Sequence, residues 1–149
     1  MSERLTYRLF EERDLPSLLR LWEGAGWGAL TPEQWRSWFV ETPNGQALVV
    51  VAVDASGEVV AQEMFMPSRV WTEGREVRAL RFSAPILNKE LRGESLRRAE
   101  HPTVELYKVA AREAARAGFS VVYSLPEYAW LPVFRLAERF GVPRFAEAS

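Results

Sequence analysis

The stretch that most constrains the fold of this chain runs from Val77 to Pro126. It reads as a strand, a basic loop containing a glycine, an alanine-rich helix that ends at Gly118, and a second, buried strand. A helical crossover of this kind joins two parallel strands. The start of such a helix directs backbone N–H groups and the positive end of the helix dipole at one spot, which suits a phosphorylated ligand. The segment therefore predicts part of an α/β sheet beside a candidate anion-binding loop.

The rest of the sequence predicts a strand, two helices and an antiparallel meander. Residues 5–9 alternate between apolar and polar side chains, as expected of a half-buried strand. Asp14 is a suitable N-cap for the first helix, and Thr31 with Gln34 forms a capping box for the second. Three strands in hairpins follow, the last from about Glu76 to Ile86. With a final helix, the expected order is β-α-α-β-β-β-α-β-α, an α/β fold with a mixed sheet.

Composition narrows the chemistry of this chain, which we predict to be a single domain over residues 1–149. There is no cysteine and only one histidine, so we expect neither a thiolate site nor a metal site. The 19 basic and 20 acidic side chains nearly cancel, which argues against nucleic acid as a partner. The longest apolar run, seven residues from Ala47 to Val53, is too short to cross a bilayer. We therefore predict a cytoplasmic protein without a membrane partner.

Two local sequences suggest a family. One runs from Phe10 to Pro16 at the start of the first predicted helix, and the other is Pro43-Asn44-Gly45, which precedes an apolar strand and a hairpin with Asp and Gly in its turn. Together with the order of elements, they resemble the GNAT N-acetyltransferase superfamily over nearly the whole chain. The resemblance implies a GNAT-like sheet and transfer of an acetyl group from acetyl-CoA to an amine. Because few residues follow Gly141, we expect a divergent or truncated member whose C-terminal strands are missing or shortened.

The resemblance also implies where the coenzyme binds. In the superfamily it docks where two central strands separate, and an Arg/Gln-x-x-Gly-x-Gly/Ala loop at a helix start holds its pyrophosphate. Glycine lets the backbone approach the phosphate closely. The nearest match here has Ser95 and Arg97 at the two small positions. We expect acetyl-CoA, as co-substrate, at Ile86, Leu87, Arg92, Gly93, Glu94, Ser95, Leu96 and Arg97. The helix start near His101 is an alternative phosphate site.

A proton donor for the departing thiolate is the first catalytic group to seek. Phe134 stands where the resemblance implies a tyrosine with this role, and phenylalanine has no proton to give. Nearby hydroxyl groups at Tyr128, Tyr123 and Ser124 are substitutes. We prefer Tyr128, which follows the strand, whereas Tyr123 is expected to alternate into the core.

An amine acceptor also needs a base, or a chain of waters, to remove its proton before it attacks the thioester. Glu127 stands at the C-terminal end of a strand, where open α/β sheets bind their ligands. We predict Glu127 as this base. Glu63 and Glu76 on the meander are rivals.

The sequence leaves the acceptor and the partners open. Trp22, Trp27, Trp35 and Trp38 could line an apolar acceptor pocket, but core packing is favoured, because Trp35 and Trp38 have helical spacing. An uncovered sheet edge predicts a possible homodimer. The first hypothesis is thus an N-acetyltransferase acting on a small-molecule or peptide amine.

Two other classes of function remain possible. One is a non-catalytic GNAT-like module that binds an acyl-CoA or a protein partner, and the missing loop glycines and Phe134 favour it. The other is a purely structural dimer module, which would bind no coenzyme. Measurements of coenzyme binding and of acetyl transfer separate the three.

Overall fold

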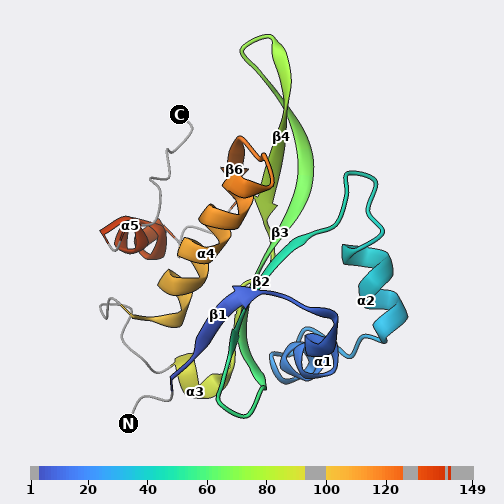
Figure 1. Ribbon diagram of the computed structural model, residues 1–149, viewed down its shortest axis with the longest axis vertical. Helices are drawn as coiled ribbons and strands as arrows, with labels where there is room; N and C mark the ends of the chain where they lie inside the picture. Colours follow the sequence, from blue (N-terminus) through green and yellow to red (C-terminus); the bar gives the residue numbers. More distant parts are fainter. Residues whose placement is uncertain (1–3, 93–99, 126–130, 140, 142–149) are drawn as a thin grey trace.

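A computed structural model describes residues 4–92, 100–125, 131–139 and 141, and these form one twisted sheet with helices on both faces (Figure 1). Helices α1 and α2 cover one face, and α4 and α5 the other. The elements in chain order are β1 (Thr6–Leu9), a 3-10 turn η1 (Glu12–Asp14), α1 (Leu15–Gly24), α2 (Pro32–Phe39), β2 (Leu48–Val53), β3 (Val59–Thr72), β4 (Arg75–Phe82), β5 (Ile86–Leu87), α3 (Lys89–Arg92), α4 (Pro102–Arg116), β6 (Val121–Tyr123) and α5 (Leu131–Arg139).

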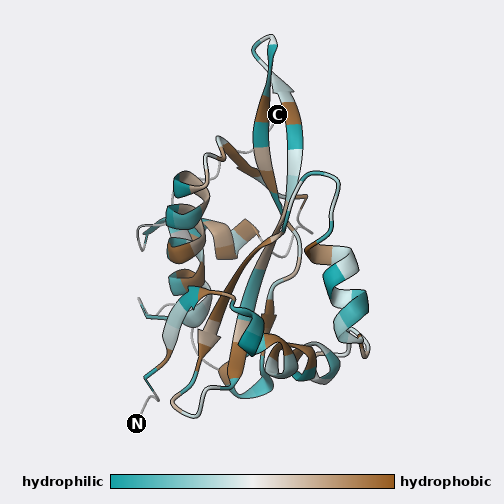
Figure 2. Cartoon of the chain, turned by 45° about the vertical axis from the view of Figure 1, so that its right-hand side comes forward, coloured by the Kyte–Doolittle hydropathy of each residue, from teal (hydrophilic) through white to brown (hydrophobic). Residues whose placement is uncertain are grey.

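The sheet has the strand order β1-β2-β3-β4-β6, and the short strand β5 also pairs with β3. All pairs are antiparallel except β4 with β6, which are parallel and joined through α4. The predicted mixed α/β sheet and its parallel crossover are therefore confirmed. The single strand predicted from Glu76 to Ile86 is instead divided into β4 and β5. The β3–β4 hairpin extends beyond the helical layers (Figures 1 and 2).

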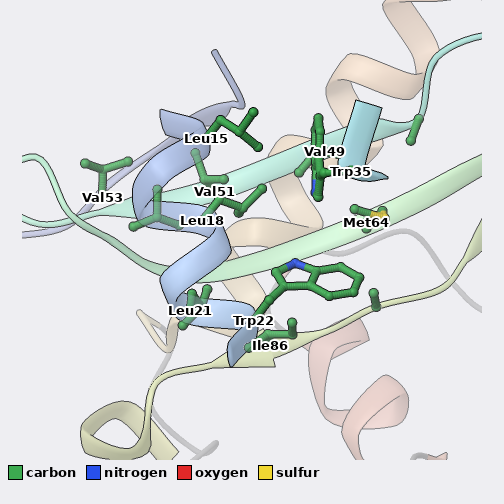
Figure 3. Close-up of a cluster of buried hydrophobic side chains, with 13 residues drawn as sticks. Leu15, Leu18, Leu21, Trp22, Trp35, Val49, Val51, Val53, Met64 and Ile86 are labelled. Carbon is green, nitrogen blue, oxygen red and sulfur yellow. The ribbon is translucent and has the colours of Figure 1, made fainter. Parts of the chain in front are cut away.

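Apolar side chains form one core on each face of the sheet, and Figure 2 shows hydrophobic residues concentrated in the central strands and along the helices that cover them. The core beneath α1 and α2 includes Trp22 and Trp35, which are buried (Figure 3). Trp27 and Trp38, in contrast, are 48% and 54% exposed. Core packing, the role favoured by the sequence, therefore holds for two of these four tryptophans and not for the other two.

The two predicted helix caps differ in outcome. Thr31 and Gln34 form the expected capping box at the start of α2. The side chain of Asp14 does not cap α1. Its carboxylate instead accepts two hydrogen bonds from Arg8, of 2.7 and 2.8 Å, and one from the N–H of Glu11. This buried carboxylate thus joins β1 to the start of α1.

We expect Asp14→Asn to destabilise the fold by about 1 to 2 kcal/mol at pH 7, since a neutral acceptor replaces a charged one. Burial raises the pKa of the Asp14 carboxyl, but hydrogen bonds from Arg8 and Glu11 outweigh it, so the pKa lies below its ordinary 3.8. The stabilisation is therefore present above pH 4 and lost as the pH falls through the folded-state pKa. Urea unfolding at pH 7 and pH 3 measures this, with exposed Glu23→Gln as the control. A constant difference between wild type and variant would contradict it.

Candidate functional site

A β-bulge interrupts the sheet between β4 and β5. Phe82 pairs with Phe65 and Ile86 pairs with Gln62, so three residues of one strand face two of the other. The extra residue falls within 83–85, where Ser83 still donates to the carbonyl of Met64 at 2.9 Å. Bulges re-aim backbone and side-chain groups and are frequent beside active sites.

The bulge begins where β4 loses its second neighbour. The parallel pairing of β4 with β6 runs from Ala79 and Val121 to Arg81 and Tyr123. Beyond Arg81, the described part of the chain supplies no further strand partner on that side of β4. The amide N–H of Ala84 makes no hydrogen bond to any described residue. The N–H of Ala84 therefore lies near the carboxyl ends of the parallel strands β4 and β6. Open α/β sheets bind their ligands at such strand ends.

A buried amide fixes the bulge from the α1 side. The side chain of Gln62 is fully buried and donates from Nε2 to the carbonyl oxygen of Ala84 at 3.0 Å. Its Oε1 accepts a hydrogen bond of 2.9 Å from the indole Nε1 of Trp22. Two hydrogen bonds thus link helix α1 to the bulge through one side chain. The sequence alone gave no signal for this role, because Gln62 is one polar residue among apolar ones.

The next residue of β3 faces the opposite side of the sheet. Glu63 is 0% exposed, and neither of its carboxyl oxygens has a hydrogen-bond partner in the part of the chain that the structure describes. It lies opposite Val50 in the register of β2 and shares its face of the strand with Ala61 and Phe65, which pack in the core beneath α4. Burial raises the pKa of Glu63 well above its ordinary value of 4.5. Its rival Glu76 is exposed on the hairpin and pairs with Arg69, so the structure separates the two.

Aromatic rings surround the end of β4 on this face. The rings of Phe82, Tyr107 and Phe134 lie 5.5 to 6.0 Å apart, from β4, α4 and α5. Tyr107 is 3% exposed, and burial followed by the charge of Glu63 raises the pKa of its hydroxyl. This hydroxyl therefore stays protonated. In the sequence, Tyr107 reads as one more apolar-face residue of the alanine-rich helix, so no local signal points to its hydroxyl.

The start of α4 has no unused backbone N–H. Pro102 lacks one, and Thr103 donates to Nδ1 of His101 at 3.2 Å. The N–H groups of Val104 and Glu105 both donate to the carbonyl oxygen of His101, at 2.9 and 3.1 Å. A helix start binds phosphate through free N–H donors, so the alternative phosphate site near His101 is unfavourable in this conformation.

The other predicted coenzyme residues fall partly within the described chain. Arg92 ends α3, and its Nε donates to the carbonyl oxygen of Leu87 at 2.9 Å, so the structure brings these two together. The side chain of Ile86 is buried in the core beneath α1, as Figure 3 shows. Gly93 to Arg97 and the predicted catalytic residues Glu127 and Tyr128 lie outside the described residues.

The other predicted hydroxyl groups lie at the end of β6. The hydroxyl oxygen of Tyr123 is 3.2 Å from Oγ of Ser68, and both side chains are partly buried. Ser124 follows directly and is also partly buried. Within the described chain, no three His, Asp or Glu side chains form a group that could hold a metal ion. No helix of that part of the chain is long and apolar enough to span a membrane.

Known structures share this architecture. An acetyltransferase of Trypanosoma brucei aligns over 98% of this chain and 97% of its own, with a TM-score of 0.63 and 17% identity. A transcriptional regulator of Bacillus halodurans aligns over 98% and 97%, with a TM-score of 0.67 and 15% identity. A GNAT family acetyltransferase of Staphylococcus aureus aligns over 97% and 96%, with a TM-score of 0.61 and 10% identity. No family model and no curated protein matches the sequence.

The class defined by these comparisons is that of the α/β proteins with an acetyltransferase fold. Within this class, the chain has the GNAT fold over nearly its whole length, and the predicted resemblance is confirmed at the level of the fold. Identities of 10 to 17% carry the fold and not the activity. The function is therefore argued from the site.

Proposed function

We propose that the protein is an acetyl-CoA-dependent N-acetyltransferase that moves an acetyl group to a small-molecule or peptide amine by direct attack. The observation that carries the proposal is the bulge at 83–85, which lies where β4 and β6 stop pairing in a GNAT fold. An unused N–H at Ala84 suits an acceptor oxygen such as that of a thioester carbonyl. Acetyl-CoA is the thioester that the fold implies.

Among the described residues, basic side chains near β5 suit the phosphate groups of acetyl-CoA. Lys89 and Arg92 are exposed beside the end of β5 and supply two cations for the phosphates. The start of α4 supplies no N–H donor for them, as shown above. We therefore propose that side-chain cations, rather than the N-terminus of α4, carry the phosphate contacts of the described residues.

Isothermal titration tests this proposal. We expect acetyl-CoA to bind with micromolar affinity and to raise the melting temperature, because a ligand of the native state stabilises it. Arg92→Ala should weaken binding by about tenfold, since one charge-assisted contact is worth about 1 to 3 kcal/mol. Arg116→Ala is the matched control, an exposed arginine that pairs with Glu113 at the far end of α4. Absence of heat and of thermal shift at millimolar ligand would rule out the proposal.

A second function is a non-catalytic module that binds an acyl-CoA or a protein partner. The satisfied N–H groups at the start of α4 and the phenylalanine at 134 favour it. Both functions allow coenzyme binding, but only the enzyme transfers the acetyl group. A screen of amines for release of the coenzyme thiol separates them: binding without thiol release would support the module.

We also propose a cytoplasmic protein that forms a homodimer. Among the described residues, the edge strand β6 pairs on one side only, with β4, and both Val122 in the strand and Leu125 beyond its end are exposed. Exposed strand edges with apolar side chains favour association. We expect sedimentation equilibrium to give twice the mass of one chain at micromolar concentration. A monomer at all concentrations would contradict the dimer.

A further inference from the structure

The carboxyl of Glu63 is fully buried, and no contact with the described residues explains how its burial would stabilise the fold. Burying a carboxyl without a hydrogen bond costs free energy, and an apolar side chain of similar size would avoid that cost. Among the described residues, neither oxygen of Glu63 has a hydrogen-bond partner and no charged neighbour offsets its burial. Unsatisfied buried groups of this kind are concentrated at functional sites.

The position of Glu63 connects it to the bulge. In β3 it lies between Gln62, which pairs with Ile86, and Met64, whose carbonyl accepts from Ser83. The strand segment opposite Glu63 is therefore the bulge itself. The amide N–H of Ala84, which marks the candidate acetyl site, therefore lies across from the strand that carries the carboxyl of Glu63.

The surroundings of Glu63 set its charge. Val50 faces it from β2, Ala61 and Phe65 flank it on β3, and these side chains are apolar. From α4, Tyr107 is the titratable group that interacts with it. Burial raises the pKa of Glu63 well above its ordinary value, which favours the neutral carboxylic acid over the carboxylate. A protonated carboxyl cannot act as the base that takes a proton from an amine, so the rival role that the sequence left open is unfavourable.

We propose that Glu63 is the proton donor of the transfer reaction and delivers its proton to the sulfur of the departing coenzyme thiolate. The inference rests on the proposed N-acetyltransferase function. The amine nitrogen forms a bond to the acetyl carbon, the carbon–sulfur bond breaks, and its electron pair stays on sulfur. Sulfur takes the proton of Glu63, and the acylated nitrogen releases one proton, which restores the carboxyl of Glu63 for the next turnover. The products are the amide and the free coenzyme thiol.

The arrangement of aromatic residues supports this role. Phe134 packs against Phe82 and Tyr107 and has no proton to offer the sulfur. On the α4 face of the sheet, the hydroxyl of Tyr107 lies within the electrostatic range of Glu63. The carboxyl of Glu63 and the hydroxyl of Tyr107 thus lie on the same side of the sheet, in the core that contains the aromatic rings at the end of β4.

The variant Glu63→Gln keeps the shape of the side chain and removes its acidic proton. We expect it to bind acetyl-CoA within twofold of wild type and to lose at least about 100-fold in turnover, the range measured for general acids. In the wild type, turnover should fall as the pH rises through the pKa of Glu63, and this limb should be absent in the variant. Exposed Glu23→Gln is the matched control and should keep wild-type turnover and pH dependence.

The outcomes are distinguishable. Wild-type protein that neither binds acetyl-CoA nor releases thiol would overturn the proposed function and this inference with it. Wild-type turnover that survives unchanged in Glu63→Gln, with the same pH profile, would overturn the inference alone. Glu63→Met serves as a second variant, since an apolar side chain suits this core, and it should be folded, bind acetyl-CoA and lack turnover.

Discussion

Gln62→Leu is expected to destabilise the fold by about 2 to 5 kcal/mol, although leucine has nearly the volume of glutamine and suits a buried strand. The substitution leaves the indole N–H of Trp22 and the carbonyl of Ala84 buried without partners. Each orphaned group costs its full desolvation penalty, whereas the pair of hydrogen bonds had offset both. Chemical denaturation at pH 7 measures the loss.

Two further variants identify the cause. Gln46→Leu introduces the same change at an exposed glutamine and should alter the free energy of unfolding by less than about 0.5 kcal/mol. Gln62→Glu can still accept from Trp22 but, when ionised, cannot donate to Ala84, so its cost should grow as the pH rises. If Gln62→Leu were as stable as wild type, the link from α1 to the bulge would have no energetic role.

Local sequence signals were sufficient for most of the fold. Alternation in the strands, Gly and Pro in the turns, and a capping box at Thr31 act over a few residues. The predicted order of elements agrees with the observed one except that one predicted strand is divided into β4 and β5 and the short helix α3 follows. Asp14 was wrongly predicted to cap α1 because its carboxylate has a stronger partner in Arg8, which reaches it from β1. A cap and an ion pair compete for the same oxygens, and the sequence does not show which one forms.

The candidate site depends on contacts that no local pattern reveals. The bulge at 83–85 arises because β3 pairs with two strands in succession, and residues 76–86 read as one strand until both pairings are known. The alternative phosphate site at His101 likewise depends on where each N–H of α4 donates. Gln62 and Glu63 are adjacent polar residues in sequence, yet Gln62 is hydrogen-bonded at both amide atoms, whereas the carboxyl of Glu63 has no partner among the described residues. That difference is a property of the packed structure.

Glu63→Leu is expected to stabilise the protein, by about 1 to 3 kcal/mol at pH 8, since leucine removes an unsatisfied buried carboxyl from an apolar core. The folded-state pKa of Glu63 lies above its ordinary value of 4.5, so the folded state holds this proton more tightly than the unfolded chain does. The stability that this provides is complete below pH 4.5 and is lost as the pH rises through the folded-state pKa.

The pH dependence therefore distinguishes this effect from better packing alone. Between pH 5 and the folded-state pKa, wild-type stability should fall by up to about 1.4 kcal/mol per pH unit relative to Glu63→Leu. Denaturant unfolding at pH 5, 6, 7 and 8 gives both curves, and a constant gap between them would show that Glu63 does not titrate on folding. A variant that gains stability and loses acetyl transfer would identify Glu63 as a residue that costs the fold free energy and serves the reaction, because activity is the usual counterpart of such a cost.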